Sequence, residues 1–237
     1  MRVLLFGATG MVGQGVLREC LRAPDVEFVQ TVGRSATGQL DPRLHEITLP
    51  DMLDYQATEA SLQGFDACFF CLGISSAGMT EDNYTRVTYD LTLAAAGTLS
   101  RLNPQMVFIY VSGAGTDSTA QGRSMWARVK GKTENALKRL PFKAVYLFRP
   151  GVIQPLHGIQ SKTRLYRLVY AAARPLFTLI RMLMPNQIVT TEGVGRAMLA
   201  LARHPRGKEV LDPVDINAIC RAEAAADASP PLTPHAG

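Results

Sequence analysis

The sequence predicts an α/β fold built on a doubly wound parallel sheet, with a small and mainly helical C-terminal lobe. Short apolar segments alternate with segments of helical periodicity from residue 1 to about residue 150. A glycine-rich turn joins the first apolar segment to the first helical one. The apolar run Phe65–Leu72 is nearly continuous, as in a strand buried on both faces. Such alternation implies a parallel sheet with right-handed crossovers.

The composition predicts one large domain with a full core. The chain has 237 residues, 47% of them hydrophobic and 19% charged. We expect the domain to span residues 1–220, with the lobe at about 153–190 and a disordered tail over 221–237, which is rich in Ala, Pro and Asp. The net charge of +5 suits a phosphorylated cofactor or an anionic surface, and it is too diffuse to indicate nucleic acid.

The location of the protein is predicted to be the cytoplasm. The sequence holds four cysteines without a scaffold-like array, which fits a reducing cytosol. Met1 leads straight into the first predicted strand, so we expect no secretory signal. No apolar run reaches the roughly 18 uninterrupted residues of a membrane span, and the sequence shows no internal repeat.

The first predicted unit is a strand over Val3–Phe6, a glycine-rich turn and a helix through Val16–Leu21. Gly7 permits a tight turn, Gly10 lets the backbone approach a pyrophosphate, and Gly13 lets the helix pack closely on the strand. The helix N-terminus offers unpaired N–H groups to phosphates. We therefore expect a dinucleotide here, the alternative being a glycine-rich turn of any doubly wound protein. The residues expected to hold the pyrophosphate are Gly7, Thr9, Gly10, Met11, Val12 and Gly13.

The end of the second strand selects the cofactor. Pro24 ends the first helix, and the strand Val26–Val32 follows and ends at Gly33. An acidic residue after it would accept hydrogen bonds from the ribose 2′-OH of NAD, whereas an arginine pairs with the 2′-phosphate of NADP. The residues present are Arg34 and Ser35, which favour NADP(H) over NAD(H). The alternative is a solvated surface arginine.

Two further strand ends are expected to border the cofactor. A short third strand is predicted over Glu46–Leu49, and the following Asp51 and Met52 would lie at the adenine edge. Asp51 would accept a hydrogen bond from the adenine amino group or cap the next helix. The strand within Phe65–Leu72 ends beside the cofactor at Cys71, Leu72 and Gly73.

The pair Cys68 and Cys71 has the spacing of a metal or redox motif. Residues three apart on a strand point to opposite faces, so the two sulfur atoms cannot converge. No second cysteine pair completes a zinc site. We therefore predict buried structural cysteines and no metal site.

The candidate catalytic residues follow the central strands. The longest helical pattern, Tyr84–Leu102, precedes a strand over Val107–Val111 that ends at Ser112. Ser112 is a candidate active-site hydroxyl or, equally, a turn serine. In the next predicted helix, Ser124–Leu140, residues Trp126 and Lys130 are four apart and share a face. The strand Ala144–Phe148 then runs into Arg149, Pro150, Gly151 and Val152.

After Gly151 the alternation of strands and helices stops. Leu165–Met184 is apolar but is interrupted by Arg167, Arg174, Pro175 and Arg181. We expect a small lobe that closes over the substrate end of the site, or alternatively a basic amphipathic face in peripheral contact with a membrane. A further helix is predicted to start within Thr190–Val194 and to run to Arg203.

Taken together, these residues resemble the short-chain dehydrogenase/reductase superfamily, which has the Rossmann fold. The resemblance is greatest to its atypical, epimerase/dehydratase-like branch, which includes the Tat-interacting oxidoreductase-like proteins. It covers about residues 1–203 and is specific for the fold rather than for a substrate. In that superfamily two long helices often pack into a dimer bundle, so we expect a monomer or a homodimer. The matching segments are Gly7–Gly13, Gly33-Arg34, Cys71–Gly73, Ser112 with Asp117, Val129–Gly131 and Arg149–Val152.

The resemblance also implies site residues. The superfamily uses a Ser or Thr, a Tyr and a Lys, with the last two spaced Tyr-x-x-x-Lys. It implies that Ser112 and Lys130 are catalytic, that Lys130 holds the nicotinamide ribose, and that Leu72 and Gly73 flank the ribose. The position of the tyrosine is occupied by Trp126, whose indole N–H only donates and cannot act as a general acid–base. The residues expected near the nicotinamide are Pro150, Gly151 and Val152.

Three functions follow from these observations. The first, which we favour, is an NADP(H)-dependent oxidoreductase of unknown small-molecule substrate with a displaced proton donor: Tyr84, Tyr89 or a water molecule ordered by Ser112. The second, suggested by Trp126, is a catalytically silent dinucleotide-binding redox sensor or partner-binding protein. The third is a membrane-surface enzyme or assembly factor that uses residues 165–184.

Overall fold

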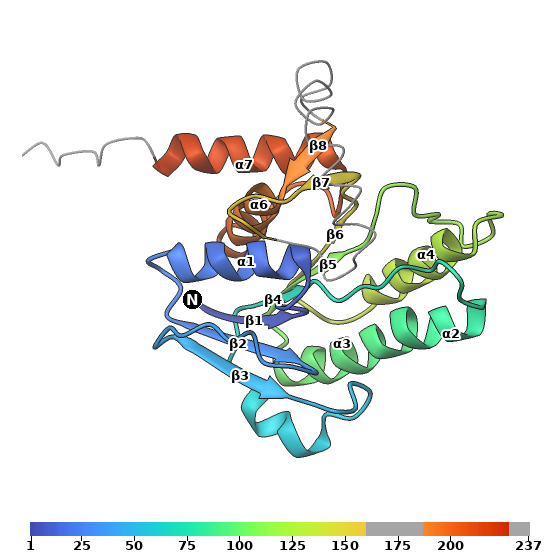
Figure 1. Ribbon diagram of the computed structural model, residues 1–237, viewed down its shortest axis with the longest axis horizontal. Coiled ribbons are helices and arrows are strands. Elements are labelled where there is room, and N and C mark those ends of the chain that lie inside the picture. The colour runs from blue at the N-terminus through green and yellow to red at the C-terminus, as the bar shows by residue number, and fades with distance from the viewer. Residues whose placement is uncertain (160–186, 228–237) are drawn as a thin grey trace, which may run out of the picture.

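Seven parallel strands form the central sheet in the order β3-β2-β1-β4-β5-β6-β9 (Figure 1). The computed structural model describes residues 1–159 and 187–227. The strands are β1 (Arg2–Phe6), β2 (Phe28–Gly33), β3 (Leu44–Thr48), β4 (Ala67–Phe70), β5 (Val107–Val111), β6 (Ala144–Phe148) and β9 (Val210–Leu211), with β7 (Val152–Gln154) and β8 (Ile188–Thr190) in a second pair. The helices are α1 (Met11–Arg22), η1 (Gln56–Leu62), α2 (Glu81–Thr85), η2 (Arg86–Asp90), α3 (Leu91–Leu102), α4 (Met125–Leu137), α6 (Thr191–Arg203) and α7 (Pro213–Asp227). This confirms the doubly wound parallel sheet, whose strand order reverses between β1 and β4.

Helices cover both faces of the sheet. Figure 1 shows α1, α6 and α7 on one side and α2, α3 and α4 on the other. Side chains alternate between the two layers along each strand: Val3 and Leu5 join the core under α1 and α6, whereas Leu4 and Phe6 join the core under α3. Because both faces of the central strands are buried, the sequences of β4 and β5 are continuously apolar, whereas the edge strand β3 includes His45 and Glu46.

The strands β5 and β6 have the predicted bounds, and the long helix starts earlier than predicted. It begins at Glu81, where the Thr80 side chain accepts a hydrogen bond from the Asn83 N–H at 3.4 Å, and it passes through the π-helical turn η2 into α3. A threonine followed by two acidic residues is a helix-start signal, which the apolar periodicity alone did not include.

The predicted disordered tail over 221–237 is wrong for residues 221–227, because these residues continue α7. The start of this helix is fixed by Asp212, whose carboxylate accepts hydrogen bonds from the Val214 N–H at 2.9 Å and the Asp215 N–H at 3.1 Å. Ile216 lies in the core with no exposed surface. The alanine-rich composition therefore stabilises a helix here. Residues 228–237 lie outside the described part of the chain.

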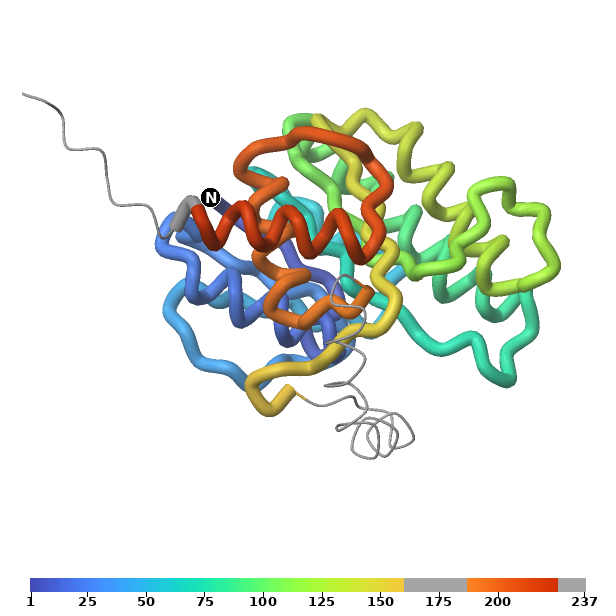
Figure 2. Tube along the Cα trace, turned by 90° about the horizontal axis from the view of Figure 1, so that it is seen from above, coloured from blue at the N-terminus to red at the C-terminus, as the bar shows by residue number. Residues whose placement is uncertain are grey.

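The described parts of the predicted lobe include a parallel pair, β7 and β8. The remainder, with the amphipathic pattern of residues 165–184, lies outside the described residues. Thr190 caps α6 by accepting a hydrogen bond from the Gly193 N–H at 2.8 Å, as the sequence predicted. Figure 2 shows α7 lying over α6 at the outside of this layer. None of the helices within residues 1–159 and 187–227 has the length and apolar character needed to cross a bilayer.

Candidate functional site

The glycine-rich turn between β1 and α1 is sterically closed to side chains. Gly7 has φ +79°, and a Cβ atom there would lie 2.8 Å from the backbone of Cys71 and Leu72 at the end of β4. A Cβ atom on Gly13 would lie 2.0 Å from the Gly7 carbonyl oxygen. The Gly10 N–H donates to that same oxygen at 2.9 Å. The turn and the close helix–strand packing predicted for Gly7 and Gly13 are thus present.

The N-terminus of α1 opens at this turn without a side-chain cap. Gly10 is the N-cap residue, and the first turn of the helix contains no acidic residue. The Gln14 side chain donates to the Thr9 carbonyl oxygen at 3.1 Å and so fixes the loop from outside. The first N–H groups of a helix have no intrahelical acceptor. Together with the helix dipole, they suit the binding of a phosphate at this end of α1.

The strand β2 is followed by Arg34, a cationic side chain that is exposed to solvent. Arg34 and Ser35 are exposed, and within the described residues the Arg34 guanidinium has no ion pair or hydrogen bond. Glu46, the acidic residue of the neighbouring strand β3, accepts hydrogen bonds from the backbone N–H of Thr37 at 2.8 Å and from its hydroxyl. The positive charge at this strand end is therefore available to an anionic ligand.

The loop after β3 is organised locally. The Asp51 carboxylate accepts a hydrogen bond from the Leu53 N–H at 2.9 Å, and η1 starts after Tyr55 without a side-chain cap, so Asp51 does not cap that helix. The Met52 side chain is buried in the core under α3. The adenine contacts of Asp51 and Met52 stay predictions.

Cys68 is buried, as the sequence predicted, whereas Cys71 is only partly buried. Cys68 lies in the core under α3, whereas Cys71 packs against the core under α1. Burial raises the pKa of both thiols, so both are neutral at physiological pH. In the part of the chain that the structure describes, no group of three or more His, Cys, Asp or Glu side chains is placed to hold a metal ion.

Ser112 lies at the end of β5 and is buried. Its hydroxyl is 3.0 Å from the hydroxyl of Thr116, which itself donates to the Gly113 carbonyl oxygen at 2.8 Å. Each hydroxyl has one hydrogen, so the Ser112 hydrogen points to Thr116. Ser112 can then accept a hydrogen bond from a ligand, but in this state it donates none. Thr116 is a site residue that the sequence analysis did not identify, although both hydroxyls flank one short glycine-rich loop.

Trp126 packs against the backbone of the same loop. A Cβ atom on Gly115, which has φ +86°, would lie 3.4 Å from Cη2 of the indole, and one on Gly113 would lie 4.0 Å from Cζ3. The benzene end of the indole thus rests on the glycines that follow Ser112. The indole is partly exposed, and its N–H has no hydrogen-bond partner among the described residues.

Lys130 lies one helical turn after Trp126, with its Nζ 5.3 Å from the centre of the Tyr110 ring on β5. Burial lowers the pKa of the Lys130 ammonium to about 8, and Glu134 opposes this shift. The carboxylate of Glu134 is 1% exposed and pairs instead with Arg149, whose Nε donates to it at 3.0 Å. No carboxylate of the described residues forms an ion pair with Lys130.

Asp117 and Gly131, two residues of the family motif, stabilise the backbone around this site. Asp117 accepts hydrogen bonds from the Thr119 hydroxyl at 2.7 Å and from the N–H groups of Gly122 and Thr119, and these bonds hold its pKa at about 2. A Cβ atom on Gly131 would lie 1.7 Å from the Asp117 carbonyl oxygen. Glycine at this position therefore lets α4 pack directly on the loop after β5 and places Lys130 over the strand.

The segment after β6 lies beside the loop after β5. The carbonyl oxygen of Pro150 accepts a hydrogen bond from the Ala114 N–H at 3.0 Å, and a Cβ atom on Gly151 would lie 3.8 Å from the Cβ of Ala114. Val152 is 44% exposed. Pro150 and Gly151 therefore lie against the loop after β5, and the predicted position of residues 150–152 near the nicotinamide stays a prediction.

The two tyrosines considered as displaced proton donors have different surroundings. Tyr84 is 2% exposed, and burial raises the pKa of its phenol. Tyr89 lies under Lys132, whose Nζ is 4.7 Å from the ring centre. Lys132 is two residues from Lys130 and so faces away from the sheet. Tyr84 is thus enclosed and Tyr89 packs under Lys132, and their role as proton donors stays a prediction.

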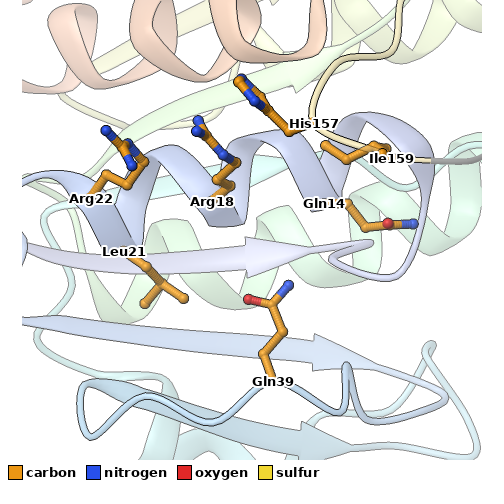
Figure 3. Close-up of a pocket in the computed structure, with 8 residues that line it drawn as sticks. Gln14, Arg18, Leu21, Arg22, Gln39, His157 and Ile159 are labelled. Carbon is orange, nitrogen blue, oxygen red and sulfur yellow. The ribbon is translucent and has the colours of Figure 1, made fainter.

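A groove of about 380 Å³ runs along the outer face of α1 (Figure 3). Gln14, Arg18 and Arg22 line it from α1, and His157 lies at its rim. Two of its charged side chains are paired: Arg18 contacts Glu19 and Glu192, and His157 Nε2 lies 2.6 Å from the Glu192 carboxylate. Arg22 is exposed and has no ion pair among the described residues.

Comparisons with known proteins agree with this geometry. No protein-family profile matches the chain. It is 29% identical over 152 residues to Protein FMP52-2, mitochondrial, of Scheffersomyces stipitis, which is 63% of this chain and 65% of that protein. It is 27% identical over 154 residues to Protein HTATIP2 of Rattus norvegicus, which is 64% of this chain and 62% of that protein. The chain thus spans less than two thirds of either relative.

The fold of this chain is similar to the folds of solved structures. The crystal structure of UDP-glucuronic acid 4-epimerase from Bacillus cereus in complex with NAD superposes with a TM-score of 0.63 at 16% identity, over 97% of this chain and 85% of that one. The chain is therefore related in sequence to HTATIP2 and the Fmp52 proteins, and it has the Rossmann fold of short-chain dehydrogenase/reductase enzymes, in agreement with its resemblance to their atypical branch.

Proposed function

We propose that this protein binds NADP(H) and acts as an oxidoreductase on a small molecule. The observation that carries the proposal is the glycine turn, where a Cβ atom on Gly7 or Gly13 would collide with backbone and where the uncapped end of α1 opens. The turn thus leaves no room for side chains, and the free N–H groups at the helix end can bind a pyrophosphate. The related epimerase structure was solved in complex with NAD.

Different residues of this chain would bind different parts of the cofactor. The N–H groups of Met11 and Val12 would bind the pyrophosphate at the end of α1. Arg34 would pair with the 2′-phosphate, and this distinguishes NADP(H) from NAD(H). Lys130 would donate hydrogen bonds to the nicotinamide ribose from its position over β5. When bound, NADPH supplies a hydride to the substrate.

Calorimetric titration of the purified protein with NADPH and NADH tests this proposal. We expect NADPH to bind more tightly, and Arg34→Ala to weaken NADPH binding about 10- to 100-fold, as for a lost charged hydrogen bond, while NADH binding stays the same. Arg86→Ala is the matched control, because Arg86 is exposed on η2, outside the proposed site. Equal losses for both nucleotides in Arg34→Ala would contradict the 2′-phosphate role, and no binding of either would overturn the proposal.

A second candidate function is a catalytically silent NADP(H)-binding sensor or partner-binding protein. It is favoured by the end of β5, where Trp126 replaces the expected phenol and the Ser112 hydrogen is directed to Thr116. It predicts NADPH binding and protection against heat without turnover of any acceptor. The cytoplasmic location, the absence of nucleic-acid partners and a monomeric or homodimeric state stay predictions; the relative FMP52-2 is named as a mitochondrial protein.

A further inference from the structure

The groove along the outer face of α1 is lined by a row of basic side chains. Figure 3 shows Arg22, Arg18 and His157 in sequence along the helix, with their side chains on the same side of it. Arg18 and Arg22 are four residues apart and are therefore neighbours on one helix face. Arg22 is exposed and has no ion pair or hydrogen bond among the described residues. Its guanidinium is thus free to bind an anion.

Arg18 keeps unused hydrogen-bond donors although it takes part in ion pairs. It contacts the Glu19 carboxylate and lies 4.0 Å from that of Glu192, and both contacts use Nη1. Within the described residues, Nε and Nη2 of the same guanidinium have no partner. A guanidinium carries five N–H donors in a fixed fork. Arg18 can therefore hold Glu19 and donate to a second anion at the same time.

The two carboxylates behind the groove are already shared among several cations. Glu19 is 4% exposed and also accepts a hydrogen bond from Nε of Arg196 at 3.4 Å. Glu192 lies 2.6 Å from Nε2 of His157 and 3.2 Å from Nη2 of Arg196. With the two arginines of α1, three guanidinium groups thus face two carboxylates, which leaves a net charge of +1. Protonation of His157 raises this charge to +2.

The residues around the groove supply no further acid to cancel this charge. Residues 160–186, which follow Ile159 at the rim, contain no aspartate or glutamate, and neither do residues 228–237. Asp41, in the connection that also carries Gln39, pairs with Arg43, whose Nε lies 3.2 Å from its carboxylate. The positive charge of the groove therefore does not depend on where the undescribed residues lie.

The C-terminal end of α1 would repel an anion if its carbonyl groups were bare. Arg43 binds these groups. Its guanidinium donates to the carbonyl oxygen of Val26 at 3.1 Å and to that of Ala23 at 3.3 Å, and it also contacts the carbonyl oxygen of Leu21. This cation offsets the negative end of the helix dipole, so an anion beside Arg22 meets little repulsion from the helix.

The size and lining of the groove indicate the class of anion. Its volume of about 380 Å³ lies in the range of small-molecule sites, which begins at about 300 Å³. Leu21 and Ile159 offer apolar contacts, and Gln14 and Gln39 offer amides. Above its second pKa of about 6, a phosphate monoester is a dianion with three acceptor oxygens, and arginine forks bind such a group in bidentate fashion. Charge, donors and size all match this group.

We propose that the groove binds a phosphate monoester through Arg18 and Arg22, with the organic part of the ligand against Leu21 and Ile159. The site is separate from the proposed cofactor site, because Arg22 lies about 16 Å along the helix from the first residue of α1, Met11. The phosphate belongs either to a soluble molecule or to a lipid headgroup, since both present the same chemistry to the two guanidinium groups.

Phenyl phosphate tests the proposal without any nucleotide, and phenyl sulfate is the control of similar shape with one charge less. Two-dimensional ¹H–¹⁵N NMR of labelled protein at about pH 7.5 and low salt follows the backbone amides of α1 and the arginine Nε–H groups. We expect saturable shifts at Arg18 and Arg22 and a dissociation constant at least about 10-fold weaker for phenyl sulfate, as for the loss of one charged hydrogen bond. Equal affinity for the two probes, or no saturable shift, would overturn the proposal.

Three variants locate the bound phosphate. Arg22→Gln removes an exposed and unpaired side chain, so we expect an intact fold and phenyl phosphate binding about 10- to 100-fold weaker. Arg86→Gln removes the same charge from an exposed arginine on η2 and should leave binding unchanged. Arg34→Gln should also leave it unchanged. Equal losses in Arg22→Gln and Arg86→Gln would show general charge attraction, and a larger loss in Arg34→Gln would place the phosphate at the cofactor site; either result contradicts the proposal.

Vesicles distinguish the two sources of the phosphate. Phosphatidylcholine vesicles with phosphatidic acid present a phosphate monoester, whereas those with phosphatidylglycerol present a diester. Cosedimentation with the first kind only, lost in Arg22→Gln, would assign a lipid headgroup. Phenyl phosphate binding without preference between the vesicles would assign a soluble ligand. If calorimetry shows no NADPH binding, the proposed function fails while the groove is still tested, because neither probe requires the cofactor.

Discussion

A Cβ atom on Gly13 would lie 2.0 Å from the carbonyl oxygen of Gly7. The helix that opens the proposed cofactor site is therefore locked to the strand before it by the absence of a side chain. Gly7 cannot shift to make room for a side chain on Gly13, because Gly7 itself lies against the backbone of Cys71 and Leu72.

The first prediction follows from this contact. Gly13→Ala should destabilise the protein by about 1–3 kcal/mol, as for an overpacked core, and should abolish NADPH binding through displacement of α1. Gly97→Ala is the control, because Gly97 lies in α3 with open space around it; there alanine should stabilise the helix by up to about 1 kcal/mol. Urea unfolding measures both. A Gly13→Ala protein of unchanged stability would show that the turn adapts to a side chain.

The second prediction concerns the buried pair of Glu134 and Arg149. Glu134→Gln leaves the guanidinium without its counter-ion and should cost about 3–5 kcal/mol of stability. Glu59→Gln, which breaks the more exposed pair with Arg101, should cost at most about 1 kcal/mol. Urea unfolding of the two variants measures the contrast. Equal losses would mean that the pair at Glu134 is hydrated rather than buried.

The third prediction is a pH dependence that comes from Lys130. Its pKa is lowered from 10.5 to about 8 by burial, so between these values the unfolded state binds more protons than the folded state. Stability therefore gains a rising contribution from pH 8 to pH 10.5, and the full penalty of about 3 kcal/mol, as an order of magnitude, is present below pH 8.

Lys130→Met removes this penalty. The variant should be more stable than the parent protein at pH 7, and the difference should shrink as the pH approaches 10.5. Lys130→Arg keeps its charge throughout this range and should show no such gain. Urea unfolding at several pH values gives the curves. A constant difference between Lys130→Met and the parent protein would contradict the lowered pKa.

The fourth prediction concerns the hydroxyl pair of Ser112 and Thr116. Thr116→Val leaves the buried Ser112 hydroxyl without its acceptor and should cost about 1–3 kcal/mol. Thr116→Ser keeps a hydroxyl at the same position and should retain most of the stability. The melting temperatures of the two variants measure this difference in stability. Similar melting temperatures would show that the Ser112 hydroxyl finds another acceptor in Thr116→Val.

Much of the framework was predictable because it depends on local spacing. The glycines at 7, 10 and 13 between an apolar run and a helical pattern indicate the first unit, and the steric contacts of Gly7 and Gly13 follow from the same spacing. The opposite faces of Cys68 and Cys71 follow from the two-residue period of a strand. The cap at Thr190 follows from its position before a helical pattern.

Other features could not be predicted from the sequence, because they depend on contacts between segments that are distant along the chain. Glu46 on β3 accepts a hydrogen bond from Thr37 in the connection between β2 and β3. The helix α7 packs on the core through Ile216, which precedes the predicted tail, and continues through residues 221–227 of that tail. Tyr84 was a reasonable donor candidate by sequence, and packing encloses it.

The sequence by itself thus determined the strand–turn–helix unit, the parallel sheet, the buried cysteines and the replacement of the phenol by Trp126, because each depends on residue type and short spacing. Only the tertiary structure decided that Ser112 gives its hydrogen to Thr116, that Glu134 pairs with Arg149, and that Lys130 lies over Tyr110. The direction of a hydrogen bond and the pKa of a buried amine depend on which groups folding brings within a few ångströms, and the spacing along one chain does not specify this.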